Sequence, residues 1–163
     1  MVPDDKTLED LAAQIVERMT ASSQMLATAE SCTGGWVSKL ITDIAGSSVV
    51  LDRGFVTYSN EAKQEMLGVP AEILDAYGAV SAETVVAMAL GAIERSRADI
   101  ALAISGIAGP GGGSDEKPVG TVFIAWADRS DAKVERALFD GDRESIRRQA
   151  AGRALQGILE SLG

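Results

Sequence analysis

The sequence predicts an α/β fold, a three-layer α/β/α sandwich around a mixed, mostly parallel sheet. Segments with apolar residues at helical spacing alternate with short apolar runs that are typical of buried strands. The run Asp99–Ser105 (DIALAIS) is apolar almost throughout, as expected of a central strand covered on both faces. The last two predicted strands follow each other directly, which indicates that the sheet is mixed.

The first half of the chain alternates helix and strand. Apolar residues recur at helical spacing over about 5–20, so this segment is an amphipathic helix. A short buried strand follows at Met25–Ala29, and a second helix runs from Trp36 to near Gly46. The stretch Val49–Thr57 is the next expected strand.

The middle of the chain contains three helices with recognisable ends. Asn60 is the expected cap of the first, which ends at Gly68. Pro70 suits the first turn of the second, which Gly78 closes, and Ser81 is the expected cap of the third, which runs through about Arg97. After the strand at 99–105, a glycine-rich loop runs over 106–118.

The C-terminal part comprises two strands and one helix. The strands, Val119–Ala127 and Lys133–Phe139, are joined by a turn at 128–131, and charged residues on the second predict that it lies at a sheet edge. Asp142 is the expected cap of the last helix.

Composition restricts the possible functions. The 163 residues are expected to form one domain over 1–163, and the net charge of −9 disfavours binding to nucleic acid or an anionic membrane. A single cysteine and no histidine exclude an internal disulfide, histidine zinc sites and the Ser-His-Asp triad. No metal or other cofactor is expected, and the carboxylates Asp140, Asp142 and Glu144 are explained by capping and arginine pairing.

The sequence also predicts the cellular compartment of the protein. No apolar run approaches the roughly 20 residues that span a bilayer, and the first residues lack the features of a signal peptide. A cytoplasmic protein is therefore expected. The apolar-rich small domain also suggests a homodimer or higher homo-oligomer.

Ser31 is the first candidate for chemistry. It lies between a predicted strand and a predicted helix, where open α/β sheets bind ligands. Backbone N–H groups of Thr33, Gly34 and Gly35 could hold an oxyanion or a phosphate there. The alternative is that Ser31 or Thr33 simply caps the helix. The neighbouring Cys32 is expected to be a small buried residue rather than a nucleophile.

Without histidine, a serine nucleophile needs another base, and Lys63 is the candidate. If Asn60 caps its helix, Lys63 occupies the third helical position. Both the helix dipole and burial in a cleft would lower the pKa of this amine and favour the neutral form that a base requires. The alternative is a solvated lysine. The other lysines, which are expected to be surface charges or a loop contact to substrate, are Lys6, Lys39, Lys117 and Lys133.

Two further segments could bind an anion. The loop that begins at Ser105 and Gly106 has many N–H groups that could cradle a phosphate or carboxylate, but it is neither a Walker A loop nor a dinucleotide-binding loop. Arg143 and Arg147 lie four residues apart at a helix start and could clamp a phosphate. The alternatives are a flexible surface loop and a salt-bridged surface helix.

Six ordered segments together resemble the CinA C-terminal domain family over roughly 8–162. They are Thr28–Gly35 (TAESCTGG), Gly54–Asn60 (GFVTYSN), Gly78–Ser81 (GAVS), Ser105–Pro110 (SGIAGP), Lys117–Val122 (KPVGTV) and Gly141–Arg143 (GDR). Stand-alone members of this family are nicotinamide-nucleotide amidohydrolases. Larger members carry an additional N-terminal domain, whose activities are not carried over.

The resemblance implies hydrolysis of nicotinamide mononucleotide to nicotinate mononucleotide and ammonia, in salvage of pyridine nucleotides, by a serine/lysine mechanism. It implies Ser31 as nucleophile, Lys63 as base, and Tyr58 as a group that assists proton transfer or orients Lys63. Backbone N–H groups around Thr33 and Gly34 would hold the oxyanion. The implied substrate-binding residues are Thr33, Gly34, Gly35, Asn60, Ser105, Gly106, Gly109, Gly111 and Arg143. Two alternatives remain, namely a non-catalytic nucleotide-binding or regulatory domain and an amidase for another small amide.

Overall fold

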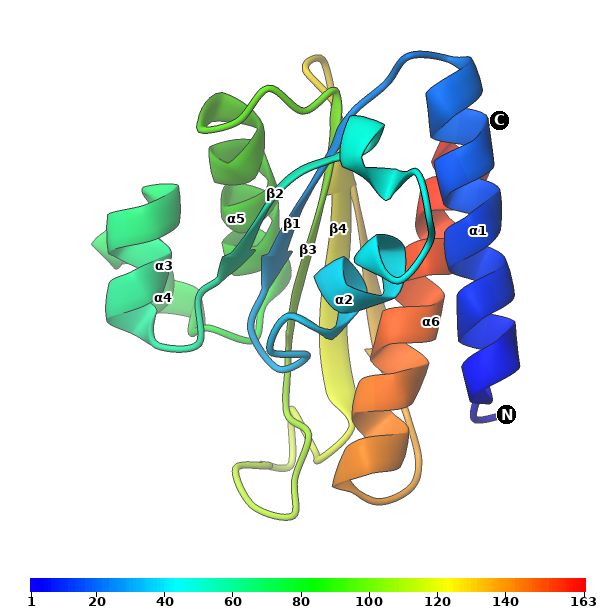
Figure 1. Ribbon diagram of the computed structural model, residues 1–163. Coiled ribbons are helices and arrows are strands. Elements are labelled where there is room, and N and C mark those ends of the chain that lie inside the picture. The colour runs from blue at the N-terminus through cyan, green and yellow to red at the C-terminus, as the bar shows by residue number, and fades with distance from the viewer.

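The computed structural model describes all residues, 1–163, as a central sheet with helices on both faces (Figure 1). The helices are α1 (Asp5–Ala21), α2 (Trp36–Thr42), α3 (Asn60–Leu67), α4 (Ala71–Tyr77), α5 (Ala82–Glu94) and α6 (Arg143–Ser161). The strands are β1 (Leu26–Glu30), β2 (Leu51–Val56), β3 (Ile100–Gly106), β4 (Thr121–Ala127) and β5 (Ala132–Leu138). The predicted α/β sandwich is confirmed.

The sheet is mixed, as predicted. Its strand order is β2-β1-β3-β4-β5, with β1 parallel to both β2 and β3. β4 runs antiparallel to β3, and β5 runs antiparallel to β4 at the sheet edge. The charged strand is therefore an edge strand, as its composition predicted.

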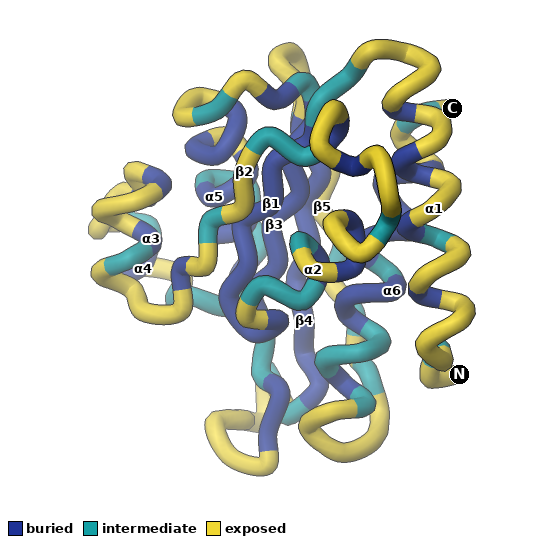
Figure 2. Tube along the Cα trace, viewed as in Figure 1, coloured by how far each residue is buried: buried dark blue, intermediate teal, exposed yellow.

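The two faces of the sheet carry side chains of different size. Large aliphatic residues such as Leu102, Ile104 and Ile124 pack against α1, α2 and α6. Alanines on the opposite face, among them Ala103 and Ala125, pack against α5. Because successive side chains of a strand point to opposite faces, the alternation of large and small residues separates these two layers. The inner strands β1, β3 and β4 are buried, whereas the edge strands β2 and β5, the loops and the outer helix faces carry the exposed residues (Figure 2).

Several predicted helix ends are wrong by a few residues. α2 ends at Thr42, because a short 3₁₀ turn at Ser47–Val49 leads into β2. α5 ends at Glu94 rather than near Arg97. None of the helices is both long enough and apolar enough to pass through a membrane.

Candidate active site

A pocket of about 290 Å³ opens at the carboxyl ends of β1 and β3. The turn after β1, the end of β3 and the glycine-rich loop contribute most of its walls. The connection between α4 and α5 closes one side. Its lining residues are Ser31, Cys32, Tyr58, Lys63, Ala79, Val80, Ser105, Gly106, Ile107, Ala108, Gly109, Gly111, Gly112 and Arg143.

Ser31 and Lys63 meet in this pocket. The Nζ atom of Lys63 lies 3.0 Å from Oγ of Ser31, and it donates to the backbone carbonyl of Thr57 at 2.8 Å. The Tyr58 carbonyl lies 3.4 Å from the same atom. Only 1% of Lys63 is exposed, and no carboxylate lies within ion-pair distance of it. The solvated alternative for Lys63 is therefore wrong.

Burial lowers the pKa of the Lys63 amine, because water no longer solvates its charged form. The predicted helix cap needs a correction. Ser59, not Asn60, caps α3, since its hydroxyl accepts the N–H of Ala62 at 3.0 Å. Lys63 therefore occupies the fourth helical position rather than the third.

Glu30 holds the turn that carries Ser31, a position that the sequence pattern did not indicate. It is wholly buried, and its carboxylate accepts the N–H groups of Val37 and Ser38 at 3.0 and 3.1 Å. It also accepts the Thr33 hydroxyl at 2.6 Å. This carboxylate therefore occupies the N-terminus of α2, whose cap residue Gly35 has no side chain. The idea that Ser31 or Thr33 caps this helix is wrong, and Ser31 is left free to face the pocket.

Some predicted binding residues lie outside the pocket. The N–H of Gly34 donates to the Ser31 carbonyl at 3.1 Å, which closes the turn after β1. Thr33 is fully enclosed. Gly35 adopts φ +100° beside Val56, and Asn60 is exposed at the start of α3. The pocket lining contains none of Thr33, Gly34, Gly35 and Asn60.

Arg143 lies at the exposed mouth of the pocket. Its guanidinium donates to the Gly109 carbonyl at 2.7 Å and to the Tyr58 hydroxyl at 3.2 Å. The Tyr58 side chain is largely exposed, so its phenol contacts Arg143 and only its backbone contacts Lys63. A cation and a phenol therefore stand at the pocket mouth, while Ser31 and Lys63 lie at its floor.

Arg147 has a different position from Arg143. It donates to the carbonyls of Cys32 and Thr33 at 2.9 and 3.1 Å and lies over the Trp36 ring. Arg147 thus holds the turn that contains Ser31 from outside the pocket, whose lining does not include it.

Lys117 anchors the glycine-rich loop. Its Nζ donates to the carbonyls of Val80 and Tyr77 at 2.6 and 3.1 Å. The loop is thereby tied to the α4–α5 connection on the other side of the pocket. Gly111 differs from its neighbours, because a side chain added there would meet nothing within 4 Å.

Cys32 is buried, as expected, and burial raises the pKa of its thiol to about 12. A thiol with that pKa is a poor nucleophile near neutral pH. No group of histidine, cysteine or carboxylate side chains is arranged to hold a metal ion. Asp142 instead caps α6 through the N–H of Ser145, and Glu144 pairs with Arg148.

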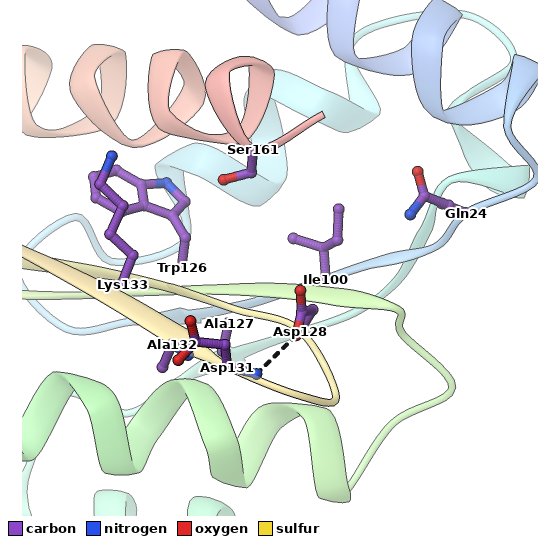
Figure 3. A pocket seen from close by; sticks show the side chains of 9 residues that line it. All are labelled: Gln24, Ile100, Trp126, Ala127, Asp128, Asp131, Ala132, Lys133 and Ser161. Atoms are coloured by element: carbon purple, nitrogen blue, oxygen red, sulfur yellow. Dashed lines mark hydrogen bonds between the residues drawn. The ribbon is translucent and has the colours of Figure 1, made fainter. Parts of the chain in front are cut away.

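A second pocket, of about 200 Å³, lies near the opposite end of β4 (Figure 3). Asp128 faces it, but its carboxylate accepts the N–H groups of Ser130 and Asp131 within its own turn. The Lys133 amine lies 6.0 Å from the centre of the Trp126 ring. None of the residues singled out for chemistry lines this pocket, so the pocket at Ser31 is the candidate active site.

Comparison with known proteins shows the family of the chain. The family model of the CinA C-terminal domain matches residues 8–162. The chain belongs to the CinA C-terminal domain family. The six segments on which the resemblance rests include Ser31, Tyr58, Ser105 and Arg143 of the pocket.

Relatives in this CinA family include stand-alone and longer proteins. The chain is 56% identical over 157 residues to the nicotinamide-nucleotide amidohydrolase PncC of Escherichia coli strain K12, covering 96% of this chain and 95% of that protein. It is 49% identical over 150 residues to the protein of the same name from Pseudomonas putida, covering 92% and 94%. A CinA-like protein of Akkermansia muciniphila is 53% identical over 152 residues, which cover 93% of this chain and 37% of that protein.

Solved structures of the family have the same fold. The competence/damage inducible protein CihA of Agrobacterium tumefaciens matches with a TM-score of 0.93 at 48% identity, covering 99% of this chain and 98% of that one. A CinA superfamily protein from Klebsiella pneumoniae matches with a TM-score of 0.92 at 40% identity, covering 95% and 97%. The arrangement of layers around the pocket is thus that of the CinA family.

Proposed function

We propose that this protein hydrolyses the carboxamide of nicotinamide mononucleotide, giving nicotinate mononucleotide and ammonia. The observation that carries the proposal is the 3.0 Å contact between Ser31 Oγ and the buried amine of Lys63. The protein is an amidohydrolase, as its near-full-length relatives named nicotinamide-nucleotide amidohydrolase indicate.

The surroundings of Lys63 suit a neutral amine. A neutral amine has two N–H donors, which match the carbonyls of Thr57 and Tyr58, and one lone pair, which can accept the Ser31 hydroxyl proton. Burial without a carboxylate partner disfavours the ammonium form. Lys63 is therefore suited to act as a general base toward Ser31.

The reaction then proceeds in two steps, acylation of Ser31 and hydrolysis of the resulting ester. Lys63 takes the proton from Ser31 Oγ as this atom attacks the carboxamide carbon. The resulting ammonium returns the proton to the leaving nitrogen, which departs as ammonia and leaves an ester on Ser31. A water molecule, deprotonated by Lys63, attacks the ester and releases the carboxylate, and Lys63 returns the proton to Ser31.

The oxyanion formed in each step needs donors in the pocket. The resemblance suggested N–H groups around Thr33 and Gly34, but the first is enclosed and the second closes the turn. We propose the N–H of Cys32 in their place, because Cys32 lines the pocket and its N–H has no protein acceptor. This group belongs to the residue directly after the nucleophile.

The rest of the nucleotide would extend from the pocket floor toward its mouth. Gly106, Gly109 and Gly111 line that path, and Arg143 supplies the positive charge for the phosphate at its end. The Tyr58 phenol, bonded to Arg143, would lie near the phosphate rather than near the proton transfer. Its backbone carbonyl orients Lys63 instead.

Ammonia release from three substrates tests this function. The proposal predicts turnover of nicotinamide mononucleotide, a large loss with the riboside, and a further loss with free nicotinamide. The variants Ser31→Ala and Lys63→Ala should fold and lose turnover by at least about 10³-fold. Nucleotide binding without ammonia release would instead indicate a regulatory domain. Equal turnover of mononucleotide and riboside would indicate an amidase for another small amide.

We also propose that the enzyme acts in pyridine nucleotide salvage in the cytoplasm, as a homodimer or higher homo-oligomer. The low cysteine content is compatible with a reducing compartment. An apolar groove on α4 and α5, lined by the half-buried Ile73 and Val86 and the exposed Leu90, is available for self-association. Sedimentation analysis of the purified protein tests the oligomeric state.

A further inference from the structure

Ser105 occupies the position beside the nucleophile on the neighbouring strand. Glu30 of β1 pairs with Ile104 of β3, and the N–H of Ser31 donates to the Ile104 carbonyl at 3.0 Å. Ser105 is the next residue of β3, and Ser31 directly follows the last residue of β1, so the two lie side by side where these parallel strands end. Strand neighbours at this separation, about 5 Å between backbones, can contact one small group together.

The two serine side chains also lie on the same face of the sheet. Glu30 and Ile104 point toward α2 and α6, where the first caps α2 and the second joins the large aliphatic core. Side chains alternate along a strand, so Ser105 of β3 points to the opposite face. Ser31, just past β1, points the same way, because its hydroxyl contacts Lys63 of α3, which packs on α5 of that face. Ser105 thus stands on the β3 side of Ser31.

The Ser105 hydroxyl is available to a ligand. The residue is only 1% exposed and lines the pocket, and none of the side-chain hydrogen bonds of the structure involves its hydroxyl. The hydroxyl is not one of the fully enclosed unpaired atoms, which are Thr57 Oγ1 and Glu83 Oε2, so it is open to the pocket. Buried hydroxyls are normally paired, so this hydroxyl is expected to bond a group that enters the pocket. That group must lie close to Ser31, at the floor of the pocket and far from the exposed mouth at Arg143.

We propose that Ser105 is a catalytic residue that donates a hydrogen bond to the oxyanion formed when Ser31 attacks the carboxamide. Lys63 already holds the proton that the leaving nitrogen needs, so the oxyanion is directed away from Lys63, toward Ser105 on the β3 side. The unpaired N–H of Cys32, which also lines the pocket, would be the second donor. The inference rests on the proposed amide hydrolysis. It replaces the contact to ribose that the family resemblance implies for Ser105.

Steady-state kinetics of Ser105→Ala with nicotinamide mononucleotide test the proposal. Loss of one oxyanion donor should lower kcat by about 100-fold with little change in KM. Ser105→Thr keeps the hydroxyl and should retain most activity, whereas Ser105→Cys keeps the size with a weak donor and should lose kcat. Ser47→Ala is a matched control, because Ser47 is also a buried serine but lies outside the pocket, in the α2–β2 connection.

Binding measurements separate this role from a contact to ribose. In a Ser31→Ala background, adding Ser105→Ala should leave the Kd for nicotinamide mononucleotide unchanged, since no oxyanion forms. A weaker Kd, a raised KM with normal kcat, or full activity of folded Ser105→Cys would each overturn the proposal. If wild-type protein releases no ammonia, or if Ser31→Ala stays active, the proposed function itself fails. If those two results are as expected and only the Ser105 variants disagree, the inference alone fails.

Discussion

At the scale of single residues, the pairing of Ser31 with Lys63 ties activity to the charge of one amine. Below its lowered pKa, Lys63 is an ammonium and cannot accept the Ser31 proton. We therefore expect kcat/KM to rise with pH through that pKa and to level off below the value of 10.5 for an ordinary lysine. The measurement is a pH–rate profile with nicotinamide mononucleotide.

The control for this profile is Tyr58→Phe. The Tyr58 phenol bonds Arg143, so its removal should weaken substrate binding but leave the rising limb at the same pH. A limb that moves or vanishes in Tyr58→Phe would contradict its assignment to Lys63.

Burial of the Lys63 amine also makes the stability of the fold depend on pH. Its pKa is lower in the folded protein than in the unfolded chain, so the unfolded state binds more protons and stability rises with pH between the two pKa values. Lys63→Met removes the titrating amine and should abolish activity, and it also leaves the Thr57 carbonyl without its donor. Its unfolding free energy relative to wild type should therefore be most favourable near pH 7 and fall as pH rises, because only wild type gains stability from the loss of the lysine proton. Thermal melts of both proteins from pH 7 to 10.5 measure this, and a difference in melting temperature that does not change with pH contradicts the prediction.

At the scale of elements, the turn after β1 is held by a carboxylate inside the protein. Each oxygen of Glu30 accepts one N–H of α2, from Val37 and Ser38 respectively. Glu30→Gln replaces one acceptor oxygen by an amide NH₂, so one buried donor loses its partner. We expect a loss of about 1–3 kcal/mol in unfolding free energy and a lower kcat, measured by chemical denaturation and ammonia release.

Glu144→Gln is the matched control for that substitution. Glu144 lies in the first turn of α6, is largely exposed, and pairs with Arg148 at 3.3 Å. Exposed pairs contribute little, so this variant should unfold and turn over like wild type. Equal effects of the two substitutions would contradict the role of Glu30.

The sequence could predict most helices and strands, but not which residues cap α2 and α3. Repeated apolar spacing is local, which is why α1, β3 and α6 are found close to their expected ranges. Ser59 and Asn60 are both good cap formers, and only the hydrogen bond to Ala62 decides between them. Glu30 caps α2 from a strand that ends before the turn, and no local cap pattern reports such a contact.

The site itself was only partly predictable. Ser31 and Lys63 are 32 residues apart, so their contact depends on which strands pair and how α3 crosses the sheet. Motif positions placed Arg143 and the glycine loop at the same pocket, but spacing could not show that Arg147 faces away from it. The position of Ser105 beside Ser31 likewise follows only from the strand register.

At the scale of the whole molecule, the unequal faces of the sheet connect the core to the active site. α5 packs on alanines of β3 and β4, and α3, which carries Lys63, packs on α5. A larger side chain on that face must push α5 outward, because the layer has no space for it. The distance between Lys63 and Ser31 then depends on side chains that never touch substrate.

Two neighbouring residues of β4 test this connection. Ala125 faces α5, and Ala125→Leu should lower the free energy of unfolding by about 1–3 kcal/mol and lower kcat by displacing α3. Ile124 faces α6, and Ile124→Val should lower the free energy of unfolding by about 0.5–1.5 kcal/mol with kcat unchanged, since α3 is not on that side. Thermal melts and ammonia release at a temperature where both variants stay folded provide the measurement. Equal kcat in the two variants would show that α3 keeps its place independently of α5.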